Sequence, residues 1–87
     1  MNGRALVAWN LRRIRVERGL SQERLAYDAQ VDRSYVGGLE REEENPTVDL
    51  LDRLAETLRV PLGELFRAPR ENAKRPATLP KGRRPAK

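Results

Sequence analysis

The side chains that could do chemistry in this chain are arginines, carboxylates and hydroxyls. Its 87 residues include 18 Lys and Arg and 13 Asp and Glu, but neither histidine nor cysteine. These absences exclude a cysteine nucleophile, a Ser-His relay, a thiolate or imidazole zinc site and the usual haem ligands. No two carboxylates are placed in a pocket that a small helical bundle could hold. We therefore expect no enzymatic activity, no cofactor and no metal, and a role in binding instead.

The positive charge is concentrated at the end of the chain. Residues 67–87 carry eight basic residues and one acidic residue, together with four of the six prolines. The whole chain carries a net charge of +5, so residues 1–66 are slightly acidic. Because Leu79 is its only large aliphatic residue, the segment 67–87 is expected to be a disordered tail after a single domain. The tail either solubilises the protein or adds non-specific affinity for phosphate or an acidic partner.

The sequence favours a cytoplasmic protein without a membrane segment. Its longest apolar run, Ala5–Trp9, has five residues, whereas a membrane helix needs about 20. No longer apolar stretch follows a basic start, as a signal peptide requires. The lack of cysteine also removes any argument from disulfides for secretion.

Apolar residues recur at helical spacing in five short segments. Ser21, Asp32 and Thr47 are N-cap candidates, Gly19 supplies a left-handed stop, and Pro61 suits the start of a helix. No segment alternates with the period of two that a strand requires. The expected helices, with their caps, cover about residues 4–18, 21–29, 32–41, 47–58 and 61–66.

Two short helices joined by a tight turn, inside a small bundle, are the outline of a helix-turn-helix domain. The residues make this outline more specific, because several motifs occur in the order and spacing of one family. The chain resembles the Cro/repressor helix-turn-helix family of bacteria and phages, also called the XRE family. The resemblance implies an all-α, five-helix, lambda-repressor-like bundle that binds double-stranded DNA. The motifs are Arg18–Ala26 (RGLSQERLA), Arg33–Val36 (RSYV), Leu39–Arg41 (LER), Asn45–Thr47 (NPT) and Val60–Phe66 (VPLGELF).

The resemblance implies phosphate contacts at the start of the second helix. The predicted phosphate contacts here are Ser21, which is mainly a cap, and Gln22. Gln22 would hydrogen-bond a phosphate beside the backbone N–H groups of the first turn. The alternative for Gln22 is a solvated surface residue. Arg41, after the third helix, is a further candidate for a phosphate contact.

The resemblance also implies that the third helix enters the major groove with its N-terminal end first. Val36 and Leu39 are expected in the core, so the face with residues 33, 34, 37, 38 and 41 is expected to be exposed. Arg33 is the strongest candidate, because its guanidinium can pair with O6 and N7 of guanine, although it could be a plain surface arginine. Tyr35 would contact DNA or cover the edge of the core. The predicted base-contacting residues are Arg33, Ser34, Tyr35 and Gly38.

Two segments depart from the family pattern. Gly37 and Gly38 lie inside a helix, where each costs about 1 kcal/mol relative to alanine. They either allow a close approach to DNA or are tolerated by a helix that its neighbours hold. Glu42–Glu44 stand where the family usually has a glycine followed by basic or polar residues near the DNA backbone. Three carboxylates oppose DNA binding there unless they tilt away, face another subunit or form a solvated loop. Because Gly38 removes a side chain that often reads a base in the family, we expect fewer base contacts than usual, with more weight on Arg33 and on DNA shape.

Other matching residues are expected to have structural roles. Arg15 on the first helix and Glu40 on the third match a family ion pair that sets the angle between these helices. The basic cluster of the first helix could offset the acidic loop, as far as its members lie on the DNA side; it consists of Arg12, Arg13, Arg15 and Arg18.

The resemblance further implies a homodimer that binds an inverted repeat. The expected dimer interface is the last helix, with Leu62, Leu65 and Phe66, although these residues could instead close the monomer's own core. Trp9 is large for an exposed position, so it packs under the last helix or lies in the dimer interface.

The sequence therefore favours a small sequence-specific transcriptional regulator, a dimeric repressor or autoregulator that reads the major groove. Its size resembles that of stand-alone repressors and of the controller proteins of restriction-modification systems. The alternative is an antitoxin or adaptor on the same fold, which would bind a protein partner through the basic tail or the acidic loop.

Overall fold

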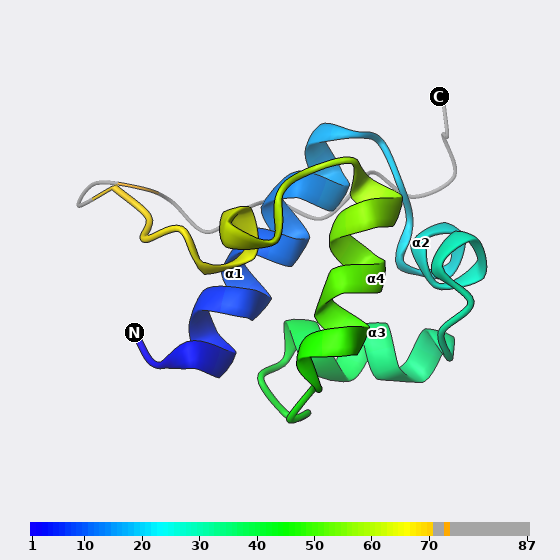
Figure 1. Ribbon diagram of the computed structural model, residues 1–87, viewed down its shortest axis with the longest axis horizontal. Coiled ribbons are helices and arrows are strands. Elements are labelled where there is room, and N and C mark those ends of the chain that lie inside the picture. The colour runs from blue at the N-terminus through cyan, green and yellow to red at the C-terminus, as the bar shows by residue number, and fades with distance from the viewer. Residues whose placement is uncertain (71–72, 74–87) are drawn as a thin grey trace.

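A computed structural model describes residues 1–70 and residue 73, and within that part the chain is helical with no strand. Figure 1 shows α4 in the middle, with α1 to its left, α2 to its right and α3 below. The expected all-α bundle is therefore confirmed, whereas most of the tail predicted for residues 67–87 lies outside the described residues. The elements are α1 (Gly3–Glu17), α2 (Gln22–Ala29), α3 (Arg33–Glu40), α4 (Val48–Leu58) and the 3-10 helix η1 (Leu62–Phe66).

The helix starts follow local capping chemistry. Ser21, Asp32 and Thr47 cap α2, α3 and α4, and their side-chain oxygens accept backbone N–H groups at 2.8–3.0 Å. Such a cap satisfies one of the N–H groups that the first turn leaves without a partner. Asn2 caps α1 in the same way, at 2.9 Å from the Ala5 nitrogen, so α1 begins slightly earlier than the sequence predicted.

The turn between α2 and α3 depends on a left-handed residue. Gln30 has φ 58°, and the following Val31 N–H donates to the Ala26 carbonyl at 2.9 Å. This bond satisfies a carbonyl at the end of α2 while the chain reverses toward α3. The predicted stop at Gly19 is also left-handed, with φ 69°. Glu42, which follows α3, has φ 63° although it carries a side chain, and it turns the chain sharply back.

One apolar core holds the elements together. α1 packs against α3 and η1, α2 packs against α3 and α4, and α4 packs against η1. Fully burying one leucine side chain contributes about 1.5–3 kcal/mol of stability. Because α3 packs on α1 and α2 through this core, the core sets the orientation of α3. Within the described residues, no helix is long and apolar enough to span a membrane. The fully buried apolar residues are Leu11, Ile14, Leu25, Val36, Leu54, Leu58 and Leu65.

Candidate nucleic-acid interface

The first turn of α2 places Gln22 beside the end of α3. The half-buried Gln22 side chain donates from Nε2 to Glu40 Oε1 at 3.0 Å. The amide nitrogen that was predicted to bind a phosphate is therefore engaged inside the protein. Ser21, the other predicted residue, uses its Oγ to accept the Arg24 N–H at 2.9 Å. A phosphate at this helix start would first meet the backbone N–H groups, and a direct contact from Gln22 stays a prediction.

The first turn of α3 presents Arg33 and Ser34. Asp32 Oδ1 accepts the Ser34 hydroxyl at 2.7 Å and the Ser34 backbone N–H at 2.8 Å. These two hydrogen bonds hold the pKa of Asp32 below its ordinary value. Because the Ser34 hydroxyl donates to Asp32, it can offer DNA only an acceptor. Arg33 is exposed, and within residues 1–70 its guanidinium forms no ion pair, so it is available to a ligand.

The middle of α3 differs from the prediction. Gly37 and Gly38 were expected on the exposed face but are buried, because later side chains fold over them. A Cβ on residue 37 would lie 3.0 Å from Arg41 Nη1, and one on residue 38 would lie 2.7 Å from Glu44 Oε2. Gly38 is therefore covered by Glu44 and offers no open surface of its own to a base. Tyr35 is half-buried against the core, so at least part of its ring covers the core edge.

Arg41 follows α3 and lies on the surface. Its Nε is 3.1 Å from Glu43 Oε1, and the two side chains are 57% and 59% exposed. An exposed pair of this kind contributes about 1 kcal/mol at most. To make the predicted phosphate contact, Arg41 would therefore have to give up only its weak ion pair with Glu43.

Glu40 is the centre of a buried polar network that joins three helices. Its carboxylate accepts Arg15 Nε at 2.7 Å and Arg15 Nη2 at 3.0 Å, and its side chain is fully buried. Arg12 Nε at 3.2 Å and the Gln22 amide complete the set. Burial alone would raise the pKa of Glu40, but the hydrogen bonds and charge of these partners outweigh it and hold the pKa below its ordinary value. The sequence predicted the Arg15 pair, but not the contributions of Arg12 and Gln22.

The predicted basic cluster on and just after α1 is used within the protein. Arg12 and Arg15 pair with Glu40, and Arg18 Nε donates to the Leu58 carbonyl at the end of α4 at 2.6 Å. Arg13 is 3.4 Å from a Glu64 carboxylate oxygen. The α1 cluster is therefore committed to internal contacts, and the expectation that it would offset the acidic loop toward DNA finds no support here.

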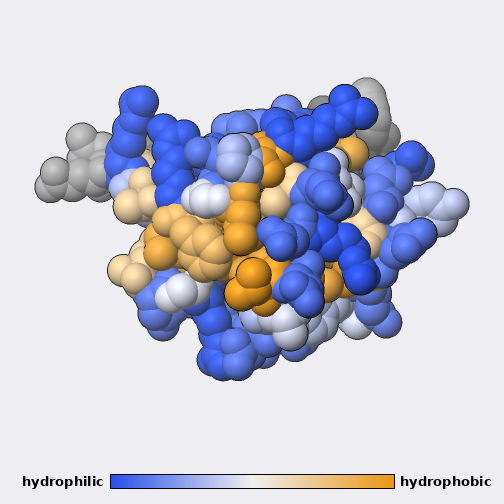
Figure 2. Space-filling model, in the orientation of Figure 1, coloured by the Kyte–Doolittle hydropathy of each residue, from blue (hydrophilic) through white to orange (hydrophobic). Residues whose placement is uncertain are grey.

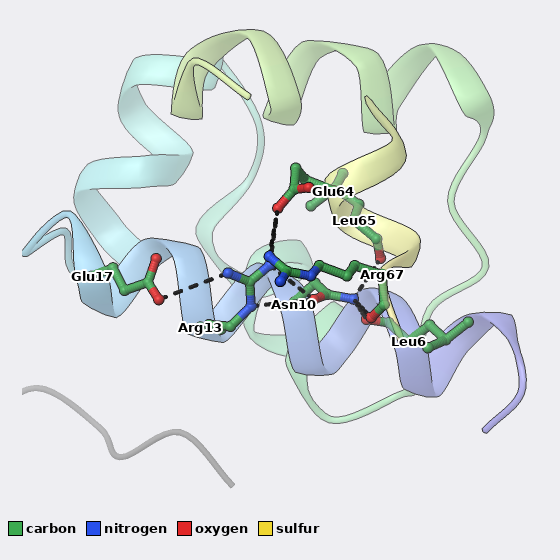
Figure 3. A network of polar contacts seen from close by, with 7 residues as sticks. All are labelled: Leu6, Asn10, Arg13, Glu17, Glu64, Leu65 and Arg67. Atoms are coloured by element: carbon green, nitrogen blue, oxygen red, sulfur yellow. Dashed lines mark hydrogen bonds and ion pairs between the residues drawn. The ribbon is translucent and has the colours of Figure 1, made fainter. Parts of the chain in front are cut away.

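Asn10 is a buried polar residue whose role was not predicted from the sequence. Its Nδ2 lies within hydrogen-bond distance of the carbonyls of Leu6 at 2.9 Å, Leu65 at 3.1 Å and Arg67 at 2.8 Å. Arg13 Nη2 in turn donates to Asn10 Oδ1 at 3.0 Å. Figure 3 shows how this network joins α1 to η1 and to the chain that leaves it. No local signal marked Asn10 as a link to η1, because its partners there, Leu65 and Arg67, lie 55 and 57 positions further along the chain.

The predicted dimer residues have different surroundings. Leu65 is fully buried and closes the monomer's own core, so its assignment to a dimer interface was wrong. Leu62 is half-buried against that core, whereas Phe66 is 42% exposed. Phe66 borders a groove together with Val7, Leu51 and Val48, which is 64% exposed. Figure 2 shows apolar residues gathered on this face of the molecule.

Trp9 lies away from that groove. It is half-buried and lines a hollow between α1 and the chain after η1, together with Asn10, Arg13 and Pro69. Trp9 was predicted either to pack under the last helix or to lie in the dimer interface. Its position beside the chain that follows η1 is nearer to the first of these two locations.

The fold and this arrangement of α2 and α3 define a helix-turn-helix protein. The helix-turn-helix family profile matches residues 11–65, and the chain belongs to this family of DNA-binding transcriptional regulators. The XRE-type resemblance is thereby confirmed. A hypothetical transcription factor of Neisseria meningitidis serogroup B is 38% identical over 71 residues, which cover 82% of this chain and 67% of the relative.

Two solved controller proteins of restriction-modification systems have the same fold. C.AhdI from Aeromonas hydrophila is 41% identical, with a TM-score of 0.70 over 72% of this chain and 96% of the other. C.Esp1396I, solved as a tetramer in complex with its natural 35 base-pair operator, is 29% identical, with a TM-score of 0.66 over 77% of this chain and 99% of the other.

Proposed function

We propose that the chain regulates transcription by binding a specific double-stranded DNA site as a two-fold dimer, with α3 in the major groove. The observation that carries this proposal is the exposed Arg33 at the N-terminal end of α3, on a helix that the buried Glu40 network holds in place. An exposed guanidinium on a helix whose position is fixed by packing can pair with O6 and N7 of one guanine. Such a regulator would act in the cytoplasm, where the DNA is.

The similar controller proteins support this proposal. One of them is solved on its operator as an even-numbered assembly, which suits a DNA site built from inverted repeats. In a two-fold dimer the two copies of α3 would lie about 34 Å apart, one turn of DNA. The operator would then contain one Arg33-dependent base pair in each half.

Arg33→Ala is expected to remove the preference for one base pair in each half-site. Binding to the wild-type site should weaken by about 1–3 kcal/mol per contact, because the bidentate guanine contact is lost. The measurement is selection from a random double-stranded DNA pool, followed by titration of the selected site against salt. Affinity must be compared at one salt concentration, since phosphate contacts make it strongly salt-dependent.

Arg59→Ala is the matched control, because Arg59 is an exposed arginine at the C-terminal cap of α4, the end remote from α3 (Figure 1). It removes the same charge and should leave the consensus unchanged. A wild-type protein that selects no consensus would contradict the proposal, and so would an Arg33→Ala variant with an unaltered consensus.

We further infer that the dimer forms through the groove bordered by Val48 and Phe66. An exposed valine and phenylalanine beside Val7 and Leu51 make an apolar face, and such faces mark sites of association. In a two-fold interface the same patch meets itself, so any substitution there acts twice.

Val48→Asp is expected to weaken the dimer at least about tenfold, because two carboxylates would be brought together in an apolar contact. Val48 is the first residue of α4, where a negative charge favours the helix, so folding should be preserved. Sedimentation over a range of protein concentrations measures the dissociation constant. Tyr27→Asp, at an exposed residue outside the groove, is the control, and equal effects of the two variants would refute this interface.

A further inference from the structure

The outer surface of α3 is built partly by residues that follow the helix. Gly37 and Gly38 carry no side chains, yet both are buried, because Arg41 lies over Gly37 and Glu44 lies over Gly38. If residue 38 had a Cβ, it would be 2.7 Å from Glu44 Oε2 and 2.8 Å from Glu44 Cγ. The glycine at position 38 therefore leaves the space that the Glu44 side chain fills.

The loop after α3 is shaped to bring Glu44 to this place. Glu42 takes a left-handed conformation with φ 63°, and the Glu43 N–H donates to the Gly38 carbonyl at 2.8 Å. The chain thus folds back along α3. Glu42 and Glu43 are exposed, whereas Glu44 is half-buried against the helix. The three consecutive carboxylates are therefore not equivalent, and only Glu44 becomes part of the α3 surface.

The position of Glu44 relates it to the residues expected to read DNA. Residues four apart share one face of a helix, so Gly38 lies one turn after Ser34 on the same face. The core-facing residues Val36 and Leu39 are on the other side. A carboxylate seated on Gly38 therefore extends the row that begins at the exposed first turn of α3.

The chemistry of a carboxylate restricts what it can bind in the major groove. An ionised glutamate only accepts hydrogen bonds, and the amino groups there are cytosine N4 and adenine N6. Adenine also presents the acceptor N7 beside its amino group, which repels a carboxylate. We propose that Glu44 is a specificity-determining residue that accepts a hydrogen bond from cytosine N4, in place of a side chain at position 38. This inference rests on the proposed DNA-binding function.

The neighbouring Glu43 provides a matched control. It carries the same charge one residue away, but it is 59% exposed and pairs with Arg41. Neutralising either residue removes one negative charge near the phosphates, which strengthens binding to all DNA sequences alike. Only neutralising Glu44 is expected to change which base is preferred.

The experiment selects binding sites from a random double-stranded DNA pool with the full-length wild type, Glu44→Gln and Glu43→Gln. The wild type should prefer cytosine at one position of each half-site. Glu44→Gln should lower that preference about tenfold and shift it toward adenine, which glutamine can pair through N6 and N7. Glu43→Gln should keep the cytosine and raise the affinity for all sites.

Gly38→Ala tests, without changing any charge, whether Glu44 must occupy the space beside position 38. The three atoms nearest to the added Cβ all belong to the Glu44 side chain, two of them within 3.0 Å, so that side chain has to move and the carboxylate is displaced. This variant should lose the cytosine preference as Glu44→Gln does. If the wild type and Arg33→Ala differ as proposed but Glu44→Gln keeps the wild-type consensus, the role of Glu44 is refuted while the regulator function stands. If the wild type selects no consensus, the proposed function itself fails.

Discussion

Glu40→Ala is expected to lower the free energy of unfolding by about 3–5 kcal/mol, because it leaves a buried arginine without its partner. The Arg15 and Glu40 side chains are 4% and 0% exposed, and the Arg15 guanidinium donates twice to the carboxylate. Small domains are stable by only about 0.05–0.15 kcal/mol per residue, so this loss is a large share of the total. Urea unfolding followed by circular dichroism measures the change.

Two variants distinguish a lost ion pair from a lost side chain. Glu40→Gln keeps an acceptor oxygen for Arg15 but removes the charge, so it should destabilise less than alanine. The double variant Arg15→Met with Glu40→Leu removes both charges and should be more stable than the sum of the single changes predicts. Additive losses in this cycle would show that the two residues act independently.

The pH dependence follows from the lowered pKa of Glu40. Because the folded pKa lies below the unfolded one, the stabilisation is fully present above the unfolded value, about 4.3, and is lost as the pH falls through the folded value. The wild type should therefore lose stability in this acidic range, where protonation of Glu40 breaks the network. Glu40→Gln should show a smaller loss over the same range, and an equal loss would assign the effect to other carboxylates.

Asn10→Asp is expected to lower the free energy of unfolding by about 3 kcal/mol or more, although the two side chains have nearly the same shape. The Asn10 amide donates toward three backbone carbonyls, and a carboxylate would face those oxygens with no proton to donate. The contact with Arg13 would remain, since Asn10 Oδ1 already accepts from it. The measurement is urea unfolding at neutral pH.

Asn10→Ala separates lost hydrogen bonds from electrostatic repulsion. It leaves the carbonyls of Leu65 and Arg67 without this donor but adds no charge, so it should cost less than Asn10→Asp. Hydrogen exchange should show faster opening of η1 in both variants, because Asn10 joins α1 to that segment. If the two variants are equally destabilised, the loss comes from the missing Asn10 donor alone, and the carboxylate adds no repulsion. If neither variant is destabilised, the carbonyls do not depend on the Asn10 donor.

The residues proposed to contact DNA could be predicted from the sequence only where their positions depend on neighbours a few residues away. Arg33 and Ser34 were placed at the start of a helix because Asp32 is a cap, and the structure shows that cap. The exposed face further along α3 was not predictable in the same way. Its surface depends on Glu44, which reaches Gly38 only because the chain turns back at Glu42.

The sequence by itself determined the helices, the three caps Ser21, Asp32 and Thr47, and the family. Apolar spacing and capping act between residues a few positions apart, so they can be read without knowing the fold. The tertiary structure alone decided that Glu40 gathers Arg12 and Gln22 as well as Arg15, that Asn10 holds η1, and that Leu65 is core rather than interface. These contacts join residues that are far apart in the chain. They form only when whole helices pack against one another, so the local sequence around each residue does not reveal its partners.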